Sequence, residues 1–408
     1  MRRALIDLGP LRVLTYRRLW IGQVLSAFGG QLTFVAVMFQ VWDQTASPAW
    51  TGAVGLAQAV PLIVLGLFAG TLADRLDRRR IYLVTTIAQL LTATVMASQL
   101  VIGRVPVGVL LALVAVQASF GATAGPVART VLPHLLSRDQ LAAGLALNRI
   151  GFQGAMLLGP ALGGVIVGTW GVGVCYLVDA LSFLAALYGV LGLPHLRIEA
   201  VAKPGLRGVW DGLSFIAATP VIRGALITDL AATVLSMPIS LFPVINAERF
   251  GNNPRTLGLF LTAIAVGGVA ASLFSGTFTR LPRHGVVMLC GSAGWGIALL
   301  LFAFSPAAWP ALVFLAVAGA ADTVAVVSRS TIVQLHTPTE LLGRVSAAEQ
   351  IVGQAGPDLG NLRGGVVAQL TSPVVSLASG ALLCVAAVAA VAGTTPGLRA
   401  AQEVPVTD

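Results

Sequence analysis

The most informative shortage in this sequence is charge. Only 10% of the 408 residues are Asp, Glu, Lys or Arg, whereas 56% are hydrophobic. A soluble protein carries roughly 25% charged residues, so this chain has too few of them to cover a surface that faces water. Most of its surface must therefore face lipid.

Residues that bind metals or attack substrates covalently are also scarce. The chain has three cysteines and four histidines, and the cysteines lie in apolar runs without metal-ligand spacing. The hydrolase motifs HExxH and GxSxG and the phosphate-binding loop of ATPases are absent. The sequence thus predicts no enzyme activity, no cofactor and no metal, and it predicts that Cys175, Cys290 and Cys384 are small buried residues.

Long apolar runs are what the sequence has in abundance. About 20 apolar residues in a helix cross the roughly 30 Å of hydrocarbon in a bilayer, and continuously apolar runs are typical of helices rather than barrel strands. The sequence therefore predicts an all-α membrane protein with twelve transmembrane helices. The predicted spans are residues 19–42, 49–73, 81–102, 105–128, 140–168, 171–193, 221–246, 255–279, 285–304, 309–330, 341–369 and 372–394.

The basic residues orient these spans. If both termini are cytoplasmic, 20 of the 25 Lys and Arg residues fall in inner segments, and Arg329, at the end of span ten, is counted among them. Three fall outside, and Arg149 and Arg363 lie within spans. This positive-inside bias predicts a multi-pass protein of the cell's inner (plasma) membrane. The net charge of +9 then faces anionic lipid, so no nucleic-acid partner is needed to explain it.

The two halves of the chain resemble each other. At an offset of 206 residues, Gly52 falls on Gly258 and the pair at 70–71 falls on Gly276-Thr277. The element GPALGG (159–164) has a counterpart in GPDLGN (356–361). Two copies of six spans in one orientation predict two pseudo-symmetric six-helix bundles, residues 1–193 and 221–408, the second with a short tail.

Residues 194–220 are predicted to be a cytoplasmic linker between the bundles. Within this segment, four apolar residues fit one face of a short helix lying at the membrane surface. They are Trp210, Leu213, Phe215 and Ile216. A plain linker fits the same residues equally well.

The segment GTLADRLDRRR (70–80) gathers six charges in positions 74–80, in the inner loop between spans two and three. It resembles the loop signature of the major facilitator superfamily: glycine, leucine, Ala-Asp-Arg, a second glycine and two basic residues. Asp77 stands in place of the second glycine, and Asp also tolerates turn geometry. GPALGG in span five resembles the Gly-Pro-x-x-Gly-Gly element of that superfamily's antiporter branch, whose members usually export. The pattern is most similar to the twelve-span exporter group that contains the enterobactin exporter and macrolide-efflux proteins.

The resemblance implies the major facilitator fold and a role for the charged loop. The loop would be a conformational latch that holds the two bundles together on the inner side, with Asp74 facing the N-terminal end of span eleven. The residues of this latch are Gly70, Asp74, Arg75, Arg78 and Arg79. A plain topology anchor is the alternative.

A second feature of expected functional importance is a group of glycines and a proline in span five. Glycines at 154, 159, 163 and 164 would let another helix approach closely, and Pro160 would bend the span. The functional interpretation is an antiporter-like kink, formed by Gly159, Pro160, Gly163 and Gly164, that shapes the bundle interface. Ordinary packing of small residues is the alternative.

Ionisable and polar residues within spans supply the remaining candidates, because charge in lipid is costly and tends to be functional. The predicted proton carriers are Asp229, Asp322 and Glu349, although each fits a structural role too, such as Asp322 paired with an arginine. A wall of amides suits an amphipathic organic molecule, although a single glutamine more often bonds two helices. The predicted substrate-cavity residues are Gln23, Gln31, Gln58, Asn148, Arg149 and Gln350.

Together these features predict a secondary active transporter that works by alternating access. The first hypothesis is a proton-coupled exporter of an organic compound such as a drug, an antibiotic or a siderophore. The alternative is an importer of a small nutrient in the same fold, and the Gly-Pro-x-x-Gly-Gly element favours export by analogy. The expected partners are the small-molecule substrate, protons and membrane lipid, and a monomer is expected to suffice.

Overall fold

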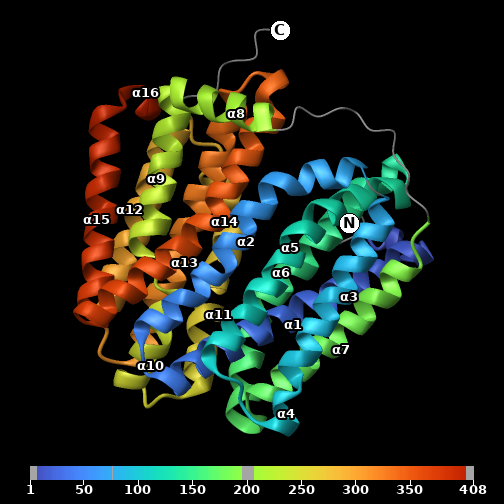
Figure 1. The fold of residues 1–408 in the computed structure, drawn as a ribbon. Coiled ribbons are helices and arrows are strands. Elements are labelled where there is room, and N and C mark those ends of the chain that lie inside the picture. The colour runs from blue at the N-terminus through green and yellow to red at the C-terminus, as the bar shows by residue number, and fades with distance from the viewer. Residues whose placement is uncertain (1–6, 76, 195–205, 401–408) are drawn as a thin grey trace. The chain divides into compact units, whose positions relative to one another are not determined.

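The computed structural model describes residues 7–75, 77–194 and 206–400, and these residues form helices without a β-strand. The chain divides into two compact units, each a bundle of long helices (Figure 1). Unit 1 comprises Met1–Gln40 and Val60–Ala202, and unit 2 comprises Val41–Ala59 and Lys203–Asp408.

The helices of the first half follow the predicted spans closely. They are η1 (Gly9–Arg12), α1 (Leu14–Thr45), α2 (Pro48–Arg75), α3 (Arg78–Ala97), α4 (Gln99–Ile102), α5 (Val107–Leu135), α6 (Arg138–Trp170) and α7 (Val172–Leu191). Several exceed the predicted apolar runs by a turn or two, because a helix can continue beyond the hydrocarbon where its side chains become polar. Gly171 ends α6 with a φ of 84°, a conformation that glycine adopts without strain.

The second half contains the remaining six spans and several short helices. These elements are α8 (Leu206–Ala218), α9 (Pro220–Ser236), η2 (Ile239–Leu241), α10 (Phe242–Arg249), α11 (Pro254–Leu273), η3 (Ser275–Thr277), α12 (His284–Ala303), α13 (Ala308–Leu335), α14 (Thr339–Leu370), α15 (Pro373–Thr394) and α16 (Pro396–Arg399). Span seven is interrupted at Pro238, which has no N–H to continue a helix. Span eight ends at Leu273 rather than near 279.

Eleven of the described helical segments are long and apolar enough to cross a membrane. The twelfth predicted span, α14, has 32 residues and is not among these eleven. It carries five charged residues: Glu340, Arg344, Glu349, Asp358 and Arg363. The twelve expected helices are therefore all present, and the one with these five charges is also one of the longest.

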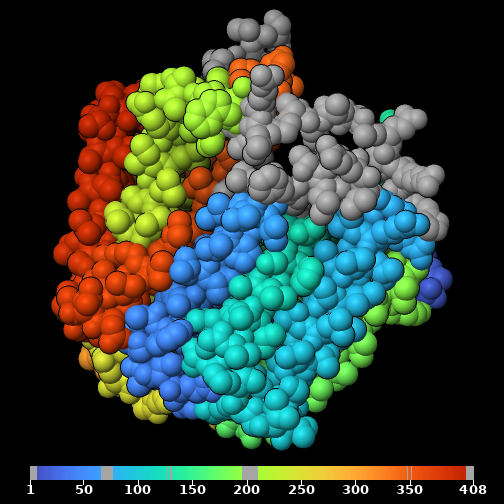
Figure 2. All heavy atoms as spheres, viewed as in Figure 1, coloured from blue at the N-terminus to red at the C-terminus, as the bar shows by residue number. Residues whose placement is uncertain are grey.

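Equivalent helices pack together in the two units, as the sequence repeat predicts. In unit 1, α3 packs against α5 and α7; in unit 2, their counterparts α12, α13 and α15 have the same partners. Figure 2 shows α3 (light blue) and α5 (teal) side by side on the exposed face of unit 1. The core between them is apolar, with Leu19, Tyr82, Val131 and Val190 buried in one cluster.

The glycine elements of the two halves also make equivalent contacts. In unit 1, a methyl group on Gly159 would come within 2.5 Å of Cβ of Gln31 on α1. In unit 2, one on Gly360 would overlap the carbonyl oxygen of Thr233 on α9. Span five thus packs on span one, and span eleven on span seven, at distances that only glycine permits.

Three expectations need correction. Gly154 has no described atom within 4 Å of an added Cβ, so it does not allow the close approach expected of it. Cys290 is exposed, whereas Cys175 and Cys384 are buried as predicted. Residues 41–59 group with unit 2 rather than with the first bundle, because the beginning of α2 packs on α14: Cβ on Gly52 would lie 2.8 Å from the Asn361 carbonyl oxygen.

The segment expected to be either an interfacial helix or a plain linker contains helix α8. Its apolar residues differ in exposure. Trp210 is 73% exposed and Leu213 is 43% exposed, whereas Ile216 is buried among residues of α9, α13 and α14. Asp211 pairs with Arg344 of α14 at 2.9 Å. Helix α8 is therefore docked on unit 2 through its C-terminal half.

Alanine at Gly360 tests the close packing of α14 on α9. We expect Gly360→Ala to lower the Tm of the purified protein, because overpacking of this kind costs about 1–3 kcal/mol. Gly154→Ala is the matched control: its methyl group meets open space, and alanine favours a helix over glycine. Equal Tm values for the two variants, measured by thermal unfolding in detergent, would contradict the packing described.

Candidate functional site

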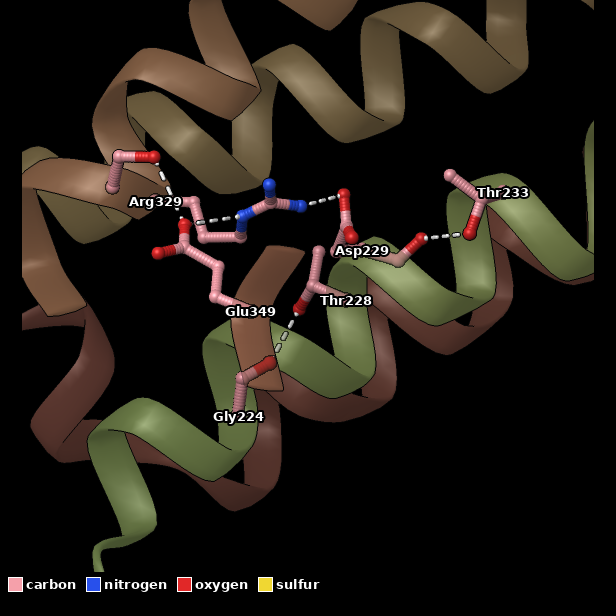
Figure 3. Close-up of polar contacts among 7 residues, drawn as sticks. Gly224, Thr228, Asp229, Thr233, Arg329 and Glu349 are labelled. Atoms are coloured by element: carbon pink, nitrogen blue, oxygen red, sulfur yellow. Dashed lines mark hydrogen bonds and ion pairs between the residues drawn. The ribbon is translucent and has the colours of Figure 1, made fainter. Parts of the chain in front are cut away.

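A buried ionic cluster joins three helices of unit 2. Arg329 of α13 lies between Asp229 of α9 and Glu349 of α14 (Figure 3). One terminal guanidinium nitrogen pairs with the Asp229 carboxylate, and Nε donates to Glu349 Oε1 at 3.2 Å. Ser330 donates a second hydrogen bond to the same oxygen at 2.9 Å. All three charged side chains are about nine-tenths buried.

An apolar cluster next to these charges explains why they meet. Leu226, Val333 and Val345 are buried together, and they come from the same three helices. Each lies three or four residues from a charged residue of its own helix, and such residues share a helix face. Packing of the apolar residues therefore brings Asp229, Arg329 and Glu349 to one place.

Charge in this cluster is unbalanced. One guanidinium faces two carboxylates, and Asp322, two turns before Arg329 on α13, is close enough to Asp229 and Arg329 to interact with their charges. Asp322 makes no ion pair or hydrogen bond with any residue that the structure describes. With all groups ionised, three carboxylates and one cation leave a net charge of −2 inside a span region. Such a site can take up a proton.

The three predicted proton carriers therefore lie near one another. What the sequence interpretation missed is Arg329, which it placed at the inner end of span ten. In the structure Arg329 is 7% exposed and paired with two carboxylates, and α13 continues past it to Leu335. The sequence did contain a signal for this role of Arg329. The carboxylates Asp229 in span seven and Glu349 in span eleven each need a cation nearby.

The other intramembrane arginine of unit 2 has a structural role. Arg363 donates to the carbonyl oxygens of Leu235, at 2.7 Å, and of Ser376, at 3.2 Å. Leu235 lies where α9 ends ahead of Pro238, so its carbonyl lacks a helical partner. Arg363 thus satisfies the interrupted backbone, which lipid could not do.

Asp179, a further carboxylate within a span, is also held by its own unit. It is 2% exposed on α7, and Thr33 of α1 donates to its Oδ2 at 2.8 Å. Gly29 lies directly against it, so that any side chain there would collide with Oδ1. These contacts join α1 to α7.

A cavity of about 650 Å³ lies within unit 1, between α1, α5 and α6. Three of the six predicted substrate-cavity residues line it: Gln23, Asn148 and Arg149. The rest of its wall is formed by Val24, Ala27, Gly125, Ala128, Leu132, Leu145 and Phe152. A pocket of this volume holds a drug-sized molecule.

Two tyrosines fix the amides of this cavity. Gln23 Nε2 donates to the Tyr82 hydroxyl at 3.1 Å. The Tyr16 hydroxyl donates to the Gly144 carbonyl at 2.9 Å and lies 3.3 Å from Asn148 Oδ1. Tyr82 and Tyr16 were not predicted to belong to this cavity, because they are 59 and 132 residues away from the amides that they hold.

The remaining predicted cavity residues lie elsewhere. Gln31 of α1 donates to the Met156 sulfur at 3.0 Å, which is a helix–helix contact of the kind considered as the alternative. Gln58 is partly buried on the segment of α2 that belongs to unit 2, and Gln350 is exposed on α14. None of these three lines the unit 1 cavity.

The predicted latch and kink are only partly visible. The surroundings of Gly70 and the side chains of Asp74 and Arg75 lie outside what the structure describes, although the α2 backbone is helical to Arg75. Arg79 donates to the Leu191 carbonyl at 3.1 Å, and the Asp77 side chain caps α3, whose first residue is Arg78. In the kink element, Gly159, Pro160, Gly163 and Gly164 are all buried, and Pro160 lies within the continuous helix α6.

The fold of this chain is similar to that of solved transporter structures. The solved structure of the nucleoside transporter NupG matches with a TM-score of 0.71 at 14% identity, over 95% of this chain and 98% of that one. The D-xylose-proton symporter matches with a TM-score of 0.72 at 12% identity, over 95% and 99%. Similarity at this level of identity shows the fold alone.

The chain belongs to the transmembrane secretion effector family of the major facilitator superfamily, whose model matches residues 6–407. The multidrug efflux pump Tap of Mycolicibacterium fortuitum is 29% identical over 377 residues, 88% of this chain and 89% of that protein. The enterobactin exporter EntS of Salmonella choleraesuis is 26% identical over 367 residues, 88% and 87%. The protein is thus a multi-pass membrane transporter of small molecules and not an enzyme.

Removal of Arg329 tests whether it holds unit 2 together. We expect Arg329→Gln to lower the Tm strongly, because a buried pair that loses one partner costs about 3–5 kcal/mol. Addition of Asp229→Asn and Glu349→Gln should recover much of the loss, since neither carboxylate that paired with Arg329 is then left charged without its partner.

The matched control is the exposed pair of Arg344 and Asp211, whose side chains are 33% and 51% accessible. Arg344→Gln should change stability by only about 0–1 kcal/mol. If the single Arg329 variant unfolds at the temperature of this control, the cluster does not hold the three helices.

Proposed function

We propose that the protein is a proton-coupled exporter of an organic compound, such as a drug, an antibiotic or a siderophore, and that it works by alternating access. The observation that carries the coupling is the excess of carboxylates around Arg329. Uptake of a proton by one carboxylate would weaken its attraction to Arg329 and free the guanidinium for the other. A change of charge at one residue would then alter the contacts between α9, α13 and α14.

Similarity to an efflux pump and to a siderophore exporter supports the direction and the substrate class. The buried Gly-Pro element of α6, expected in antiporters, agrees with export. Export of an organic molecule against its gradient would then be driven by protons that enter through the carboxylate cluster. We further propose cytoplasmic termini, as the positive-inside bias predicts, contact with anionic lipid, and function as a monomer.

The proposal is tested with inverted membrane vesicles that are energised to an acid interior. We expect them to accumulate members of a panel of amphipathic drugs and siderophores, and we expect a protonophore to abolish this accumulation. No accumulation across the panel would count against drug export. Uptake by right-side-out vesicles would then favour the importer.

The carboxylates are separated by the same assay. We expect at least one of Asp229→Asn, Asp322→Asn and Glu349→Gln to lose uphill accumulation but keep substrate exchange without a gradient, because a carboxylate that cannot titrate uncouples transport from protons. Asp211→Asn on exposed α8 is the control and should behave as the wild type. Wild-type accumulation in all three variants would exclude the cluster as the coupling site.

The latch is tested at Asp74. We propose that this carboxylate stabilises one conformation of the transporter, so Asp74→Asn should slow turnover several-fold while substrate affinity stays nearly constant. Asp74→Glu keeps the charge and should restore part of the rate. Unaltered turnover in Asp74→Asn, measured as the initial rate at saturating substrate, would leave the loop a topology anchor.

A further inference from the structure

One positively charged side chain, that of Arg149, lines the unit 1 cavity. Arg149 of α6 lines the cavity and is exposed, and it forms no ion pair or hydrogen bond with any residue that the structure describes. The arginines within the spans of unit 2 differ from it: Arg329 is paired with two carboxylates, and Arg363 is bound by two carbonyls. An arginine within a span that lacks a protein partner is expected to meet one from outside the chain.

Position along α6 rules out an end-of-helix role for this arginine. Arg149 comes eleven residues after the start of α6, which corresponds to roughly 16 Å of helix at 1.5 Å per residue. The dipole of a helix end acts within about one turn, so Arg149 is too far inside to act there. Arg149 therefore acts, if anywhere, at the cavity that it lines.

The other lining residues describe what the partner must be. No described lining residue is an aspartate or a glutamate, so none of them offers a negative charge to a cationic ligand. Asn148 adjoins Arg149 in sequence; its Oδ1 lies beside Tyr16, and its amide N–H groups have no partner among the described residues. A guanidinium and an amide N–H group are both donors, and such a set binds a carboxylate, sulfonate or phenolate oxygen.

Apolar side chains form the rest of the wall, and they determine which kind of body the acidic group of the ligand must be attached to. Phe152 lies on α6 one turn beyond Asn148, and Leu132, Leu145 and Val24 line the cavity with it. Residues three and four apart on a helix share a face, so the ring of Phe152 and the donors of the preceding turn face the same space. The ligand therefore needs an acidic group on an aromatic or aliphatic body.

We propose that the unit 1 cavity selects an organic anion, with Arg149 contacting its acidic group and Phe152 its apolar body. This inference rests on the proposed function, of which it narrows the substrate class. It makes Arg149 the residue that discriminates anions from cations. Cationic amphipathic drugs are then poor ligands of this cavity.

Three probes of the same shape and different charge test the assignment. Naphthoate is an anion, naphthamide is neutral and naphthylmethylammonium is a cation. Their binding is measured by equilibrium dialysis on the full-length protein in nanodiscs of phosphatidylcholine, without a proton gradient. We expect naphthoate to bind about tenfold more tightly than naphthylmethylammonium, with naphthamide between them.

Variants then assign the preference to one residue. Arg149→Gln should weaken naphthoate binding about tenfold and leave naphthamide nearly unchanged, while Arg149→Lys should keep most of the anion preference. Phe152→Ala should weaken all three probes. Arg255→Gln removes an exposed arginine at the start of α11 and should have no effect. A size-exclusion profile equal to that of the wild type shows that a variant is folded.

Several results would overturn the assignment. They are a preference for the cation, an anion preference that survives Arg149→Gln, and no binding of any probe by the wild type. Loss of naphthoate binding when phosphatidylglycerol replaces part of the nanodisc lipid would mean that the cavity holds a lipid anion instead. Arg149-dependent binding without gradient-driven accumulation would contradict proton-coupled export alone. Protonophore-sensitive transport of cations without such binding would contradict this inference alone.

Discussion

The sharing of one guanidinium by two carboxylates within the span region is the interaction on which unit 2 depends. Lipid offers no hydrogen bonds, so each of these charges must be satisfied by another helix. Arg329 meets that need from α13 for Asp229 on α9 and for Glu349 on α14. The relative rotation of these three helices is thereby constrained, because a shift of any one would bury a charge without its partner.

Small residues let the helices come close enough for this arrangement. Between helices in a membrane the hydrophobic effect supplies little attraction, so close packing and hydrogen bonds hold them together. Gly356 and Gly360 bring α14 against Thr233 of α9, one turn from Asp229. In unit 1, Gly159 and Gly163 bring α6 against α1 in the same way. The duplicated glycine element thus performs the same packing task in both halves.

The two units differ in what they build on this shared packing. In unit 2 the charged side chains pair with one another, in a cluster that is about nine-tenths buried. In unit 1, Arg149 has no partner among the residues that the structure describes, and it lies on the wall of a cavity. Asp179 in unit 1 is bound by a threonine hydroxyl rather than by a cation. This asymmetry assigns proton coupling to unit 2 and ligand selection to unit 1 in the mechanism that we propose.

Composition alone determined that the protein is a bundle of membrane-spanning helices. A chain with 10% charged residues must face lipid, and in lipid the backbone N–H and C=O groups must find their hydrogen bonds within the protein. The repeat and the two glycine elements likewise followed from the order of residues. Tertiary structure decided which polar residues meet. The partners Asp229, Arg329 and Glu349 span 120 residues of sequence, and uniformly apolar helices carry no pattern that tells which face turns inward. For this reason the pairing of Arg329 with two carboxylates was not predicted, and only three of six predicted cavity residues line the unit 1 cavity.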